Sequence, residues 1–293
     1  MNNVHRYQAL IETVQEGSLT KAARKLGYTQ SGITHLLSGL EAKIGLELVS
    51  RTKKGARLTE DGTRLLPYFQ AVLQAEENLH EQIERIKGLE TGTIRLGSFS
   101  SVSTTFLPKL VKQFQEMHPH INFEVLHGNY TQIETYLDAG LVDIGFLRGP
   151  LKPAFEGELF YRDQVLALLP ANHPAASHAS FALSGFEAEP FIMMEADTDN
   201  DYEHYLAENG LDPSIIYSAP EDSAVMALIE QGLGIGLGYE LSLKRSSFDI
   251  VGVELEVPFP RDIYWSTKKG VRPTWASSAF IAFLKNVDAT KLL

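Results

Sequence analysis

The sequence predicts a multidomain α+β protein, in which a small winged helix-turn-helix is joined by a long linker helix to a two-lobed α/β body. Three observations predict it: short glycine-punctuated apolar segments over residues 1–59, a heptad pattern over residues 60–88, and alternating strand and helix patterns over residues 92–293. At 293 residues the chain is long enough for two or three domains of ordinary size. We therefore expect three parts with these boundaries.

The first part contains the start and stop signals of short helices. Ser18 and Thr29 can cap two successive helices, which Gly27 and Gly45 can end. Two short helices joined at a glycine-containing turn form a helix-turn-helix. A basic turn follows at residues 51–57, between short apolar segments and with a glycine at its tip, and this pattern indicates a two-stranded wing.

Apolar residues in the second part recur at alternating spacings of three and four. This heptad pattern predicts one long helix, and its otherwise polar surface favours pairing with the same helix of a second chain. The alternative is a helix that packs on its own domain. The predicted seam consists of Leu58, Leu65, Phe69, Val72, Leu79, Ile83 and Ile86.

Strand and helix patterns alternate in the third part. The first set predicts a βαβαβ unit, and thus a mostly parallel sheet covered by helices; its segments are 93–97, 105–118, 122–127, 131–139 and 142–147. A second set follows at 165–169, 191–194, 224–230 and 235–237, and a strand at 263–267 and a helix at 275–286 close the chain. We expect lobe I at 92–161 and 266–293, lobe II at 162–265, and a ligand cleft between the lobes.

The net charge of −11 is unevenly distributed. Residues 1–59 carry nine Lys and Arg against four Glu, a net +5, whereas the remaining residues carry 17 basic and 33 acidic side chains, a net −16. A basic module on an acidic body attracts a polyanion such as double-stranded DNA at one end. The sequence has no cysteine, secretory signal or long apolar run, so we expect no disulfide, cofactor or membrane association, and a cytoplasmic location.

Two other classes of protein compete with DNA binding. An enzyme would need a catalytic motif, yet the glycine-rich run 232–238 lacks the spacing of a dinucleotide-binding or P-loop motif, and no serine has a nucleophile-elbow context. A solute-binding protein would share the two-lobed body, but it would have no use for the basic module. A DNA-binding regulator accounts for both parts.

Residues 7–66 resemble the N-terminus of LysR-type transcriptional regulators. The resemblance rests on Gly17, Ser18, Ala22, Ala23, Gln30, Ser31, Leu40, Glu41, Gly45, Leu48, Arg51, Leu58, Thr59 and Gly62, and it continues more loosely through the run 231–236. It implies a bacterial activator or repressor that binds promoter DNA as a homodimer or homotetramer. It also implies a periplasmic-binding-protein-like body whose cleft takes a small-molecule effector, such as a carboxylate.

The resemblance further implies which residues contact DNA. In the family, the second helix of the motif enters the major groove and a wing arginine reaches the minor groove; glutamine suits adenine, and arginine suits a narrow minor groove. Gly32 and His35 depart from the family pattern, which usually has a larger residue and a basic residue there. The predicted DNA-contacting set is Ser18, Thr20, Gln30, Ser31, Gly32, Thr34, His35, Arg51, Lys53 and Lys54.

The effector site is expected where strands of the body end. Hydroxyls and free backbone N–H groups after the first strand suit a polar or anionic effector, although helix capping is the alternative for these serines. Arg148 can clamp a carboxylate, and an interlobe salt bridge is the alternative. Tyr130 stands where the family usually has Ser or Thr. The predicted effector-binding set is Ser98, Ser100, Ser101, Tyr130, Thr131, Arg148, Met194 and Glu195.

Overall fold

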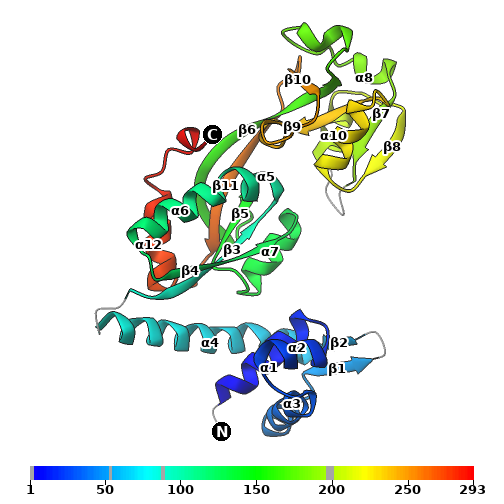
Figure 1. Ribbon diagram of the computed structural model, residues 1–293. Helices are drawn as coiled ribbons and strands as arrows, with labels where there is room; N and C mark the ends of the chain where they lie inside the picture. The colour runs from blue at the N-terminus through cyan, green and yellow to red at the C-terminus, as the bar shows by residue number, and fades with distance from the viewer. Residues whose placement is uncertain (1–2, 53–54, 87–89, 196–200) are drawn as a thin grey trace.

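The computed structural model describes residues 3–52, 55–86, 90–195 and 201–293 (Figure 1). Its N-terminal part consists of the helices α1 (Asn3–Gln15), α2 (Leu19–Leu26) and α3 (Gln30–Ile44), followed by the wing strands β1 (Val49–Thr52) and β2 (Gly55–Leu58). The predicted caps are confirmed, because the hydroxyls of Ser18 and Thr29 each accept a backbone N–H of the following helix. Gly27 and Gly45 end α2 and α3 at left-handed φ angles of 71° and 80°.

A small apolar core holds these helices together. Leu10 of α1 and Ile33, Leu37 and Leu40 of α3 are buried in it, so the opposite face of α3 is turned outward. The wing is tied to the turn between α1 and α2 by a backbone hydrogen bond of 2.9 Å from the N–H of Ala56 to a carbonyl oxygen. The sequence therefore builds one rigid platform that presents α3 and the wing.

The linker helix α4 (Glu60–Ile86) has two different halves. Phe69 is buried and stacks on Tyr7 of α1, with 4.9 Å between the ring centroids, and Leu65 packs in the same core. Leu79 and Ile83, by contrast, are 59% and 41% exposed. The first half of the predicted seam thus packs on its own domain, which was the alternative, and the second half leaves an apolar stripe in solvent.

Lobe I carries a parallel sheet in which β3 lies between β4 and β5. Its core is formed by the sheet and the helices on both faces, with Phe114, Phe146 and Phe280 fully buried. Its elements are β3 (Gly92–Ser98), α5 (Ser100–Thr105), α6 (Leu107–Met117), β4 (Ile121–His127), α7 (Tyr130–Asp138), β5 (Ile144–Arg148), α12 (Trp275–Leu284) and the short 3₁₀ turn η2 (Ala289–Leu292).

Lobe II repeats this arrangement with β7 between β8 and β9. Its elements are η1 (Pro174–Ser177), α8 (Gly185–Ala188), β7 (Phe191–Met194), α9 (Asp201–Glu208), β8 (Ile215–Ala219), α10 (Asp222–Glu230), β9 (Ile235–Tyr239), α11 (Glu240–Lys244) and β10 (Ile250–Glu254). Two antiparallel strands, β6 (Phe155–Pro170) and β11 (Pro260–Lys268), connect the lobes, as Figure 1 shows.

The structure corrects several details of the prediction. The expected helix 105–118 corresponds to α6, whose first turn suits Pro108 because this residue lacks an N–H, and the short helix α5 before it was not predicted. The strands β8 and β10 were not predicted, and antiparallel pairs of β6 and β11 make the joined sheet mixed rather than mostly parallel. The chain also returns to lobe I before residue 265, because Ile263 and Trp265 already pack in the core of lobe I.

The linker helix also contacts lobe I, beneath which it runs in Figure 1. Arg95 of β3 donates two hydrogen bonds of 3.0 Å to the carboxylate of Glu77 on α4. Next to this pair, Asp143 accepts a 2.7 Å hydrogen bond from the backbone N–H of Arg95. The bidentate ion pair of Arg95 with Glu77 and the carboxylate of Asp143 therefore lie where the linker helix meets lobe I.

Asp143 makes the stability of the protein depend on pH. Burial raises the pKa of Asp143 from its ordinary value of 3.8 to about 6, although Arg95 opposes this shift. A carboxyl whose folded pKa is raised stabilises the fold at low pH, and this contribution is lost as the pH rises through 6. We expect the stability of wild type relative to Asp143→Asn to fall by roughly 2.5 kcal/mol between pH 4 and pH 7, since one pKa unit is about 1.4 kcal/mol and the contribution is complete only below the unfolded pKa. Urea unfolding across this range measures it; a constant difference would contradict the shift.

Candidate DNA-binding surface and effector cleft

The recognition surface is the outward face of α3. Gln30, Ser31 and His35 are exposed there, and Thr34 is partly exposed. Ser31 lies 3.0 Å from the hydroxyl of Thr29, so it belongs to the cap as well as to the surface. The predicted α3 residues therefore share one face at the start of the helix, which is the end that suits contact with a groove.

The cap of α3 at Thr29 explains why a glycine occupies position 32. A Cβ added there would lie 3.2 Å from the hydroxyl oxygen of Thr29, which accepts the N–H of Gly32 itself at 3.1 Å. A larger residue would crowd the atom that caps the helix. The glycine keeps the cap intact, although it lowers the helix propensity of this turn.

The remaining predicted DNA contacts lie on the turn before α2 and on the wing. Ser18 is the N-cap of α2, and Thr20 in the first turn is exposed. Arg51 lies on β1, opposite Ala56 in the ladder. Lys53 and Lys54 fall outside the described residues.

The effector cleft lies between the lobes and has a volume of about 520 Å³, which is in the range of small-molecule sites. It brings together seven of the eight predicted side chains: Ser100, Ser101, Tyr130, Thr131, Arg148, Met194 and Glu195. Ser98 is the exception. It is fully buried at the end of β3, where its hydroxyl donates to the carbonyl of Phe99, so the prediction that it lines the cleft is wrong.

The floor of the cleft is formed by Arg261, which is not among the residues predicted from the sequence. This arginine of β11 is only 2% exposed and forms a buried ion pair with Asp163, its direct ladder partner on β6. It also donates hydrogen bonds of 2.9 Å to the hydroxyl of Ser101 and 3.2 Å to that of Tyr130. Its guanidinium lies 3.4 Å from the ring centroid of Tyr239. One side chain thus contacts both lobes and both connecting strands.

Burial changes the pKa values of the residues that surround Arg261 at the floor of the cleft. Burial raises the pKa of Asp163, even though Arg261 and two backbone N–H groups favour its ionised form. Burial likewise raises the pKa of Tyr239 well above its ordinary value. Tyr239 therefore stays neutral at physiological pH and offers Arg261 an aromatic face rather than a second anion.

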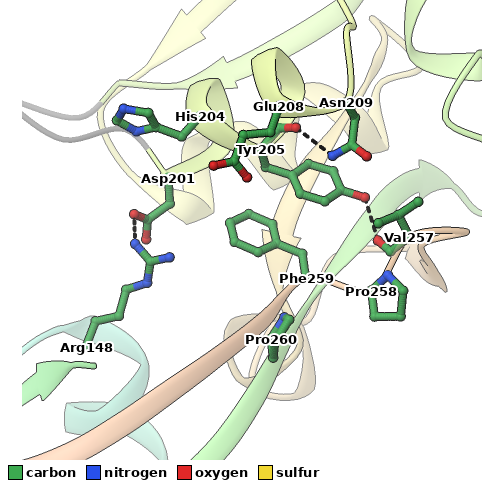
Figure 2. Close-up of a pocket in the computed structure, with 10 residues that line it drawn as sticks. All are labelled: Arg148, Asp201, His204, Tyr205, Glu208, Asn209, Val257, Pro258, Phe259 and Pro260. Carbon is green, nitrogen blue, oxygen red and sulfur yellow. Dashed lines mark hydrogen bonds and ion pairs between the residues drawn. The ribbon is translucent and has the colours of Figure 1, made fainter. Parts of the chain in front are cut away.

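Another ion pair bridges the two lobes directly. It joins Arg148, at the end of β5, to Asp201, at the start of α9 (Figure 2). Asp201 also accepts a 3.3 Å hydrogen bond from the hydroxyl of Tyr239. The pair separates the cleft from a second cavity of about 540 Å³, where Tyr205 stacks on Phe259 with 4.6 Å between ring centroids. Arg148 therefore makes the salt bridge that was the alternative to a ligand contact, and its partner Asp201 is a buried residue in the first turn of α9.

A basic winged helix-turn-helix joined to a two-lobed body with an interlobe cleft defines a DNA-binding regulator with an effector domain. The chain belongs to the LysR family of transcriptional regulators, which are not enzymes. Residues 4–63 match the model of the bacterial regulatory helix-turn-helix protein of the lysR family. Residues 87–289 match the model of the LysR substrate binding domain.

Curated relatives cover nearly the whole chain. The HTH-type transcriptional regulator YvbU of Bacillus subtilis is 26% identical and covers 97% of this chain and 98% of its own length. The regulator LrrA of Synechococcus elongatus is 29% identical, with 89% of each chain covered. Both similarities extend through the DNA-binding and effector domains.

Solved structures share the fold. Full-length OxyR of Pseudomonas aeruginosa has a TM-score of 0.75 at 15% identity, covering 100% of this chain and 94% of that chain. CbnR in complex with its target DNA has a TM-score of 0.66 at 18% identity, covering 100% of both chains. Within the described residues, no helix has the length and apolarity needed to cross a membrane, and no cluster of three potential metal ligands occurs.

Proposed function

We propose that this chain is a homo-oligomeric regulator, a dimer or tetramer, that binds promoter DNA in the cytoplasm and responds to a small carboxylate in the interlobe cleft. The exposed face of the capped helix α3 is the observation that carries the DNA-binding part. The local charge of +5 over residues 1–59 supports it, since phosphate contacts supply most of the affinity for DNA.

On this proposal the DNA contacts come from the predicted residues. Gln30 and Thr34 face base edges, and Ser31 reaches a base or a phosphate. Arg51 enters the minor groove, beside Lys53 and Lys54. Ser18 and Thr20 contact the backbone before α2, and His35 contacts a phosphate. Gly32 lets the backbone of α3 approach closely.

In the cleft, the carboxylate is bound on the lobe I side. Ser100, Ser101 and Thr131 supply hydroxyls, and Tyr130 narrows the opening by packing edge-on against Phe99 with 5.0 Å between ring centroids. Arg148 clamps the carboxylate when its pair with Asp201 opens. Met194 and Glu195 face the effector from lobe II.

Arg51→Ala tests the DNA-binding proposal. We expect binding to the DNA upstream of the gene to weaken by about 1–3 kcal/mol, because a groove contact and its positive charge are lost together. Fluorescence anisotropy at several salt concentrations measures it, and the affinity of wild type should fall steeply with salt. Arg245→Ala, which removes an exposed arginine of lobe II, is the matched control. Binding that does not depend on salt, or an Arg51→Ala variant with wild-type affinity, would contradict the proposal.

A further inference from the structure

The two walls of the effector cleft carry opposite charge. Lobe II contributes four carboxylates to the lining, and among its described lining residues there is no basic side chain. Lobe I contributes two cations against a single carboxylate, together with most of the hydroxyl groups. The lobe II carboxylates are Glu195, Asp201, Glu221 and Asp222.

The fold places two of these carboxylates together at one edge of the sheet. Glu195 follows β7 and Glu221 follows β8, and the N–H of Glu195 donates a 2.8 Å hydrogen bond to the carbonyl of Ala219. The carboxyl ends of parallel strands are where an α/β sheet binds ligands. Both side chains are exposed, and neither has a cationic partner among the described residues.

The other charges of the cleft are already compensated. Asp201 pairs with Arg148, and Lys152 pairs with Glu134 at 2.6 Å. Asp222 accepts a 2.6 Å hydrogen bond from the hydroxyl of Ser242. The excess charge of the cleft therefore lies on Glu195 and Glu221, and it is negative.

The opposite wall offers an independent sign of a ligand. Arg261 is 2% exposed and lines the same cavity, yet its Nε has no hydrogen-bond partner among the described residues. A buried guanidinium donor without a partner is costly unless an acceptor reaches it. Asp163 balances the charge of Arg261, so the floor and the lobe I wall attract an anionic group through N–H and hydroxyl donors, whereas the uncompensated charge of the lobe II wall suits a cationic group.

Resting on the proposed effector function, we propose that the effector is a zwitterion of the amino-acid class. Its carboxylate lies on the lobe I side, toward Ser101, Arg261 and the Arg148 that clamps it when the pair with Asp201 opens. Its ammonium group lies against Glu195 and Glu221. A purely anionic effector of the same shape would face two uncompensated carboxylates across the cleft, and like charges repel. The ammonium group supplies the cation that this wall lacks.

Matched ligands test the charge of the effector directly. Thermal-shift screening and calorimetry at pH 7.5 compare amino acids with the hydroxy acids of the same side chain, such as phenylalanine with phenyllactate and alanine with lactate. We expect at least one amino acid to bind roughly tenfold or more tightly than its hydroxy acid, because hydrogen bonds between charged groups are the strong ones. Hydroxy acids that bind as tightly as or more tightly than every amino acid overturn the zwitterion and leave a carboxylate effector standing. If neither the amino acids nor the hydroxy acids bind, both the zwitterion and the carboxylate effector are overturned.

Substitutions in lobe II locate the ammonium site. In the Glu195→Gln and Glu221→Gln variants, the preference for the amino acid over its hydroxy acid should fall roughly tenfold, while the affinity for the hydroxy acid stays the same or rises. Glu208→Gln, on the same lobe but lining the second cavity, is the matched control and should keep the preference. A preference that survives in the Glu195→Gln/Glu221→Gln double variant would overturn the assignment.

Discussion

Replacing Arg261 by methionine is expected to destabilise the effector domain by about 3–5 kcal/mol, the largest effect of any single substitution considered for this protein. Methionine fills much of the same volume, but it leaves Asp163 buried without its partner. The stack on Tyr239 is lost as well. Urea unfolding followed by tryptophan fluorescence measures the effect, since both tryptophans of the chain, Trp265 and Trp275, lie in lobe I.

The double variant Arg261→Met/Asp163→Asn separates a lost ion pair from general damage to the core. Most of the cost of Arg261→Met comes from the carboxylate that it strands, so removing that carboxylate should recover about half or more of the lost stability. A double variant as unstable as the sum of the two single variants would show that Arg261 acts only by packing.

Introducing aspartate into the exposed half of the linker helix is expected to separate the subunits. Leu79→Asp or Ile83→Asp places a charge in the exposed apolar stripe, which in the proposed homo-oligomer pairs with the same stripe of a second chain. We expect the dissociation constant of the dimer to rise roughly a hundredfold or more, from a loss of about 3 kcal/mol. Sedimentation velocity over a concentration series measures it.

Gln82→Asp is the control for this substitution. Gln82 is exposed and flanks the apolar stripe without belonging to it, so the same charge there should weaken the assembly much less than Leu79→Asp does. A sedimentation profile of Leu79→Asp identical to that of wild type would show that the stripe does not pair. Phe69→Asp is unsuitable for this purpose, because Phe69 is buried in the core of the DNA-binding domain.

How far the sequence predicts this structure depends on how local the interactions are. The caps at Ser18 and Thr29 and the glycine stops could be predicted, because each involves residues three or four apart. The division of the linker helix into a packed and an exposed half could not, because it depends on where Tyr7 meets Phe69 in three dimensions.

The effector cleft shows the same limit more sharply. Serines and a tyrosine next to strand ends indicated its position, yet Arg261 and Asp163 lie just outside the predicted strands 263–267 and 165–169 and were not predicted. They meet only because β6 and β11 pair in one particular register, across nearly a hundred residues of chain. No local pattern distinguished them, because β6 and β11 carry other charged residues, such as the exposed pair Arg162 and Asp262.

Strand β3 runs from the contact with the linker helix to the effector cleft. Arg95 on this strand holds the linker helix through Glu77, and Ser101, just beyond the end of the strand, lines the cleft. Arg95 and Ser101 are six residues apart in the chain, so at about 3.3 Å per residue no more than about 20 Å separates them. A change at the cleft can therefore reach the linker helix through a single strand of lobe I.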